Sequence, residues 1–253
     1  MLSQVLWWTE NALVFVLLVR ALRGRFLSKY PVFYFYIGYV LLESLSSFYI
    51  YISYPSFYET FYWYTQFLSV ALGCCIIWEI YTQALADFSG VARMARFLLA
   101  AIFLVATLKG LVDTLSGPIL SPAEIPAVLE RNLRTVQALL LVGIVGLLSY
   151  YAVPVGRNLK GMILGYGVFI SASVISLALR SHLGKEFQTL WQYFQPMAYF
   201  LTLIIWSASL WSYAPSPRAK HEISLDQDYE VLVARTAKAI AQARSYLART
   251  VQP

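Results

Sequence analysis

A few ionisable and amide side chains interrupt long apolar runs, and their types suit ligand binding better than bond-making chemistry. Glu43 lies in the run LLESLSSF, with Ser47 one helical turn further along. Lys109 and Asp113 are spaced i, i+4, so on a helix they share a face and can pair. Glu79 lies in LGCCIIWEIYTQAL, shortly after two adjacent cysteines.

These residues would be costly inside a membrane, which makes each of them a candidate site residue. A charged side chain at the centre of a bilayer costs about 2.5–3.5 kcal/mol on insertion scales. We therefore predict an outward-opening polar and aromatic pocket that binds a small amphiphilic or aromatic ligand. Its predicted lining is Glu43, Gln66, Lys109, Asp113, Tyr193 and Gln195. Pro196 has no backbone N–H, which leaves a carbonyl for a ligand or water.

Each of these groups also has a purely structural interpretation. Lys109 and Asp113 can neutralise each other, and Gln66 and Gln195 can join helices by hydrogen bonds. Glu79, on the inner side, is expected to lock onto a loop arginine or a tyrosine hydroxyl, and this lock either stabilises the bundle or gates it. Three arginines at outer helix ends can extend to lipid head groups. They are Arg131, Arg134 and Arg180.

The residue inventory argues against an enzyme, a cofactor or a metal centre. The chain has no HExxH motif and no paired aspartates within its apolar runs. Its two histidines, His182 and His221, lie at a helix end and in the tail, where they cannot hold a haem between spans. Cys74 and Cys75 are adjacent, so they form neither a disulfide framework nor a spaced metal site.

The composition predicts an all-α membrane protein with several spans. The chain is 59% hydrophobic and 13% charged, against about 25% charged in soluble domains, and its mean hydropathy is +0.62. The net charge of +6 does not indicate nucleic-acid binding, because most basic residues fall in the loops and the tail on one side of the predicted bundle.

Seven segments are long enough to cross a bilayer, which takes about 20 apolar residues. They are 5–23, 31–53, 61–84, 97–115, 132–152, 161–181 and 190–212. They form a predicted transmembrane domain, 1–213, followed by a cytoplasmic tail, 214–253. Because Lys and Arg favour the cytoplasmic side, the N-terminus is predicted outside and the C-terminus inside. Short loops and the absence of Asn-x-Ser/Thr sequons favour a bacterial inner (plasma) membrane.

The first and last three spans share residues at a nearly constant offset. Gln66 matches Gln195, Tyr64 matches Tyr193, and the triplet 76–78 (Ile-Ile-Trp) recurs at 204–206. We therefore predict a 3+1+3 internal repeat, whose site would lie between the halves. This layout is similar to that of SWEET and PQ-loop transporters and, in helix count, to rhodopsins and G-protein-coupled receptors. The resemblance concerns topology and assigns no residue roles.

The tail is predicted to form an amphipathic helix over about 226–250. Its acidic residues come first and its basic residues follow, which suits the helix dipole, and apolar residues recur at helical spacing. It is expected to lie along the inner membrane surface, with docking onto the loops or onto a partner helix as alternatives.

Three functions remain open at this point. A receptor-like or sensory protein is favoured because the polar groups concentrate in the outer half. The alternatives are a small-molecule transporter built on the repeat, and an accessory structural subunit of a larger membrane complex. The expected partners are the lipid bilayer, a small-molecule ligand and a cytoplasmic or membrane protein bound through the tail helix, with no nucleic acid.

Overall fold

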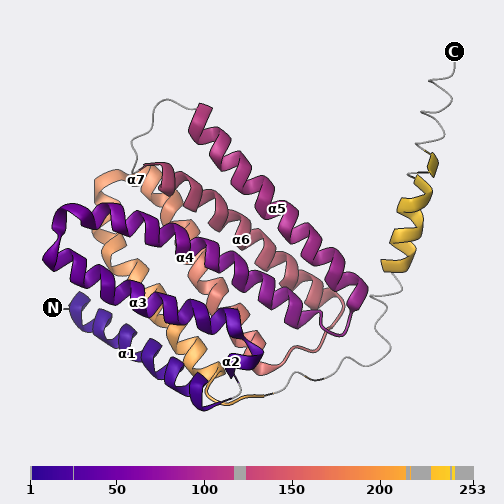
Figure 1. Cartoon of the computed structure of the whole chain (residues 1–253), viewed down its shortest axis with the longest axis horizontal. Coiled ribbons are helices and arrows are strands. Elements are labelled where there is room, and N and C mark those ends of the chain that lie inside the picture. The colour runs from indigo at the N-terminus through magenta and orange to yellow at the C-terminus, as the bar shows by residue number, and fades with distance from the viewer. Residues whose placement is uncertain are drawn as a thin grey trace.

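The computed structural model describes residues 2–24, 26–116, 124–214, 217, 229–239 and 241–242, and within these ranges the chain is helical with no strand (Figure 1). The helices are α1 (Leu2–Arg23), α2 (Phe26–Lys29), α3 (Pro31–Ser53), α4 (Pro55–Ala84), α5 (Ser89–Ser116), α6 (Glu124–Tyr150) and α7 (Arg157–Ser209). Helices α4, α5 and α6 begin six to eight residues before the predicted spans at 61, 97 and 132. Hydropathy marks only the part of a helix that is apolar, and these helices continue into more polar sequence.

Prolines set the start of two of the long helices. Pro31 opens α3 and Pro55 opens α4, at positions where the missing N–H costs nothing. The residue before a proline is pushed out of helical geometry, so Tyr54 alone separates α3 from α4. The chain therefore reverses within one residue, and α3 and α4 pack side by side.

The long helix α7 folds back on itself. A straight helix of 53 residues would be about 80 Å long, yet Asn158 Nδ2 donates to the Ser209 carbonyl at 2.7 Å. Thr202 Oγ1 also donates to the Gly165 carbonyl, at 3.3 Å. The first arm (Arg157–Ser176) and the second arm (residues 193–209) are therefore antiparallel. The predicted segments 161–181 and 190–212 overlap these two arms, and the crossing of a membrane by both arms stays a prediction.

Two glycines allow the arms of α7 to approach closely. A Cβ at Gly161 would collide with Ser209, and a Cβ at Gly165 would collide with the Trp206 ring. The two glycines are four residues apart, which is the small-xxx-small spacing of tightly packed membrane helices. Trp206 consequently lies fully buried, with its ring centroid 5.0 Å from that of Phe33 in an edge-to-face arrangement.

The hydrophobic core fills one half of the bundle, at the end where α1 and α4 finish and α3 and α7 begin. Helix α4 packs against α3, α5, α6 and α7 and forms the centre. The core includes Phe33, Ile77, Ile80, Met162 and Trp206, all fully buried. This half is the predicted inner half of the protein, and the opposite half is hollow, as described below.

Six helical stretches in the described part of the chain are long and apolar enough to cross a membrane. They are Gln4–Arg23, Pro31–Ser53, Pro55–Ala84, Gly90–Lys109, Asn132–Tyr150 and Arg157–Ser176. The chain is thus an all-helical protein with the features of an integral membrane protein. The second arm of α7, predicted as the seventh span, is not among these six.

A helix also forms in the tail, over residues 229–239, within the predicted range of 226–250. It lies beside the bundle near the start of α5 (Figure 1). The Tyr229 ring packs over Gly90, where a Cβ would come within 2.8 Å of it. The side chains from 230 to 239 are exposed, including Val231, Leu232 and Val233.

Candidate functional site

A polar cavity of about 520 Å³ lies in the half of the bundle opposite the hydrophobic core. Residues from α1, α3, α4, α6 and both arms of α7 line it. They are Glu10, Tyr36, Val40, Glu43, Tyr58, Glu59, Tyr62, Gln66, Ser69, Glu130, Arg134, Phe169, Ser173, Gln195, Pro196 and Tyr199. Most of these residues lie in the half of their helix that is nearer the N-terminus of α1, which is the predicted outer half. Tyr36 and Val40, in the first half of α3, are the exceptions.

One wall of the polar cavity carries a buried ion-pair network. Arg134 Nε donates to Glu130 Oε1 at 2.7 Å, and Gln66 Nε2 donates to the same oxygen at 2.9 Å. Arg134 is only 2% exposed, and its guanidinium lies 5.1 Å from the centroid of the Phe169 ring. Arginine forms charge-assisted hydrogen bonds and stacks on aromatic rings, so this side chain is held firmly in one place.

Several buried polar atoms in the polar cavity have no hydrogen-bond partner among the described residues. Glu10 is 8% exposed, and its Oε1 is one of these atoms. The Gln195 Oε1 and Tyr199 hydroxyl atoms are likewise buried and unpartnered. Buried polar groups are normally satisfied, because an unmade hydrogen bond costs about 1–3 kcal/mol. Three such atoms from α1 and α7 around one cavity indicate space for a polar ligand or for water.

Glu43 lies on the α3 wall of the polar cavity and is held only weakly by hydrogen bonding among the described residues. Among the described residues, its side chain accepts one hydrogen bond, from Thr65 Oγ1 at the long distance of 3.4 Å. The Thr65 hydroxyl also approaches the Phe61 and Tyr62 carbonyls at 3.0 Å, so its single hydrogen is shared. The Glu43 carboxyl group therefore retains most of its hydrogen-bonding capacity for a ligand.

Polar contacts continue below the polar cavity towards the middle of the bundle. Gln137 is fully buried and donates to the Val70 carbonyl at 2.8 Å and to Cys74 Sγ at 3.3 Å. The Tyr166 hydroxyl donates to Gln137 Oε1 at 3.5 Å. Gly73 makes room for this group, because a Cβ there would collide with the Tyr166 hydroxyl. Cys74 thus belongs to a buried polar cluster joining α4, α6 and α7.

The structure brings together three of the six residues that were predicted to line the pocket. Glu43, Gln66 and Gln195 line the polar cavity, although they come from three different helices. Tyr193 does not line it and is 49% exposed on the second arm of α7. Lys109 is exposed on α5, and none of the described side chains of that helix lines the cavity. The side chain of Asp113 is outside the part that the structure describes.

Two predictions about charged side chains are corrected. Arg134 does not extend to head groups, because it is buried and paired with Glu130. For Glu79, the partners among the described residues are backbone groups rather than an arginine or a tyrosine hydroxyl. Its two carboxylate oxygens accept the backbone N–H groups of Val32 at 3.1 Å and Phe33 at 2.9 Å. The first N–H groups of a helix lack intrahelical partners, so Glu79 of α4 caps the start of the neighbouring helix α3.

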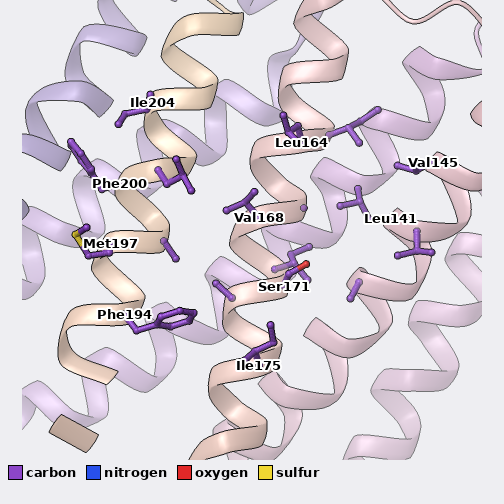
Figure 2. A pocket seen from close by; sticks show the side chains of 18 residues that line it. Leu141, Val145, Leu164, Val168, Ser171, Ile175, Phe194, Met197, Phe200 and Ile204 are labelled. Atoms are coloured by element: carbon purple, nitrogen blue, oxygen red, sulfur yellow. The ribbon is translucent and has the colours of Figure 1, made fainter. Parts of the chain in front are cut away.

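A second and larger hollow is an apolar groove of about 870 Å³ on the outside of the bundle (Figure 2). The first arm of α7 forms its floor, with α6 and the second arm on either side. Labelled lining residues are Leu141, Val145, Leu164, Val168, Ser171, Ile175, Phe194, Met197, Phe200 and Ile204. Ser171 is its only polar side chain, so the groove offers almost nothing to orient a polar ligand. The polar cavity, although smaller, is the better candidate site.

The predicted repeat agrees with the positions of side chains in the structure at some matched residues and disagrees at others. Gln66 and Gln195 both line the polar cavity, and Tyr64 and Tyr193 are both exposed. In the matched triplets, however, Ile76 and Ile77 are buried beside an exposed Trp78, whereas Ile204 is exposed and Trp206 is buried. The repeat stays a prediction.

Comparisons with protein-family models, with curated proteins and with solved structures find no match for this chain. The site and the fold therefore carry the functional argument. They define a helical membrane-type protein with a polar, tyrosine-walled cavity in one half and a packed core in the other.

Proposed function

We propose that this chain is a seven-span, N-out/C-in membrane protein that binds a small amphiphilic or aromatic ligand in the polar cavity and acts as a receptor-like or sensory protein. The single observation that carries the proposal is the convergence of unpartnered buried polar atoms on one cavity. Glu10, Gln195 and Tyr199 each supply such an atom. A ligand that satisfied them would gain hydrogen bonds that the protein leaves unmade.

The lining supports a ligand with both a polar and an apolar part. Four tyrosines and Phe169 offer ring faces and edges, and the glutamates and glutamines offer hydrogen bonds. Ligand sites commonly combine apolar walls with a few converging polar groups in this way. The volume of about 520 Å³ falls within the range of about 300–1,000 Å³ that small-molecule sites occupy.

The orientation and the seventh span belong to the same proposal. Arg20, Arg157 and Lys160 lie at the end of the bundle that also holds the hydrophobic core, in agreement with the positive-inside rule. The second arm of α7 packs along the first arm by the hydrogen bonds given above, which supports a span of similar depth. The cavity then opens outside.

A filled-cavity variant tests the proposal. Ser173 is buried on the first arm of α7 and lines the polar cavity, so Ser173→Leu should occupy part of it. Ser171→Leu is the matched control, because Ser171 lies two residues away and faces the apolar groove. Melting temperatures of the purified proteins are measured with a panel of neutral, cationic and anionic small amphiphiles. We expect some compounds to stabilise the wild type and Ser171→Leu but not Ser173→Leu. If no compound distinguishes the two variants, the cavity is not the binding site.

A transporter is the second candidate, supported by a second polar pocket at the inner end. This pocket, of about 260 Å³, is lined in part by Lys29, Gln83 and Asp87. Between the two pockets lies the packed layer that contains Phe33 and Trp206. A flux assay in liposomes separates the two functions, since a receptor binds its ligand without moving it across the membrane.

A further inference from the structure

Acidic residues outnumber basic residues in the lining of the polar cavity, and this excess of acids indicates the charge of the ligand. Among the described residues that line it are four acids, Glu10, Glu43, Glu59 and Glu130, and one base, Arg134. Arg134 is already paired with Glu130 at 2.7 Å. Glu59 is exposed at the rim, where water can solvate it. Two acids, Glu10 on α1 and Glu43 on α3, therefore line the cavity with no cation assigned to them.

We infer that the ligand carries a positively charged amine, which Glu10 and Glu43 bind as counter-charges. This inference rests on the proposed function and names the chemical class of its ligand. A carboxylate inside a membrane is stabilised by an opposite charge, and no lining residue in the described part supplies a second one. An ammonium group has three N–H donors and no acceptor, so it forms charge-assisted hydrogen bonds with carboxylates.

The walls of the polar cavity suit an organic amine better than a metal ion. The described residues contain no group of three or more His, Cys, Asp or Glu side chains placed to hold a metal. Tyr36, Tyr58, Tyr62, Tyr199 and Phe169 instead surround the acids with aromatic rings. Ammonium groups are attracted to the faces of such rings, and the apolar body of an amine gains contact area against them.

Three probes of nearly equal shape test the inference on the full chain in mild detergent. They are 2-phenylethylamine, 2-phenylethanol and 3-phenylpropionate, and their dissociation constants are measured by calorimetric titration. We expect the amine to bind at least tenfold more tightly than the alcohol, which corresponds to about 1.4 kcal/mol, and the anion to bind most weakly. This comparison uses only the wild-type protein, so it does not depend on the folding of any variant.

Two conservative variants then locate the interaction. Glu10→Gln and Glu43→Gln keep the shape of each side chain and should each weaken amine binding at least tenfold, with little change for the alcohol. Glu230→Gln, in the exposed tail helix, is the control and should change nothing. Melting curves of each variant show whether it folds.

The outcomes separate this inference from the proposed function. If the alcohol or the anion binds as tightly as the amine, and Ser173→Leu abolishes that binding, the cavity is a binding site but not one for amines. If amine binding survives both glutamate variants, the assigned counter-charges are wrong and the inference is overturned. If none of the three probes responds to Ser173→Leu, the inference and the proposed function both fail.

Discussion

Replacing Glu79 should destabilise the bundle, because this side chain caps α3 where the chain itself provides no cap. Tyr30 precedes α3 without a side-chain cap hydrogen bond, and Pro31 follows at the first turn. The next two N–H groups, of Val32 and Phe33, donate to the two oxygens of Glu79. Glu79 is 6% exposed, so water cannot easily replace it.

The expected magnitude follows from the two hydrogen bonds. A hydrogen bond to a charged group contributes about 1.5–3 kcal/mol in soluble proteins, and a negative charge at a helix N-terminus adds about 0.3–1 kcal/mol. Hydrogen bonds between membrane helices measure less, about 0.6 kcal/mol on average and up to about 1.7. We therefore expect Glu79→Ala, which leaves both N–H groups unpaired, to lower the free energy of unfolding by about 2–4 kcal/mol. Glu79→Gln retains one acceptor oxygen and should cost about half as much.

Reversible unfolding of the purified protein in mixed detergent micelles measures both variants against the wild type and against Glu230→Gln. A cap predicts the order wild type, Gln, Ala, with ligand binding in the polar cavity unchanged in the folded fraction. Equal stability of all three proteins would refute the assigned cap. Normal stability with altered ligand binding or flux would instead identify Glu79 as a gate.

Three further changes probe other contacts, each through the free energy of unfolding. Gly73→Ala should cost about 1–3 kcal/mol, because the added methyl group overpacks against the Tyr166 hydroxyl. Adding Tyr166→Phe should recover part of that loss. If the effects of the two substitutions on stability simply add, this close contact is contradicted. Arg134→Met should cost about 3 kcal/mol because it leaves Glu130 unpaired, and the double variant with Glu130→Gln should recover more than half, unless the ion pair contributes nothing. Burial, the nearby Tyr213 and the Glu79 charge raise the pKa of Tyr30 to about 12, above about 10 in an unfolded chain. Its protonated form is therefore favoured by folding, so stability should fall between about pH 10 and 12, and Tyr30→Phe should make that fall less steep.

Some residues that line the polar cavity could be identified from the sequence, because they are polar residues placed well inside apolar runs. Glu43, Gln66 and Gln195 were identified because polar residues at membrane depth are costly, and all three line the cavity. Glu130 was missed because it precedes the apolar stretch, although it lies four residues before Arg134 on α6. That i, i+4 spacing was an available signal for a buried pair rather than for an arginine reaching the head groups.

The remaining differences come from contacts that side-chain patterns do not encode. Glu79 accepts hydrogen bonds from backbone N–H groups of α3. Every residue type except proline has such a group, so the sequence does not show which of them an acidic side chain binds. Lys109 was grouped with the site because its depth fits, but α5 packs against α4 and α6, and none of its described side chains lines the cavity. Depth can be read from a single sequence, whereas the rotation of a helix about its axis and its neighbours depend on packing.

Access to the polar cavity from outside the membrane can be measured directly by cysteine labelling. Gln195→Cys is introduced after Cys74 and Cys75 are replaced by alanine, and Leu201→Cys, on the same arm but in the apolar groove, is the control. A positively charged, membrane-impermeant thiosulfonate is added to sealed vesicles of known orientation. An outward-facing cavity predicts modification of Gln195→Cys from the outside, protection by a bound ligand, and no reaction at Leu201→Cys. Modification only from the inside, or none from either side, would contradict an outward-facing binding cavity.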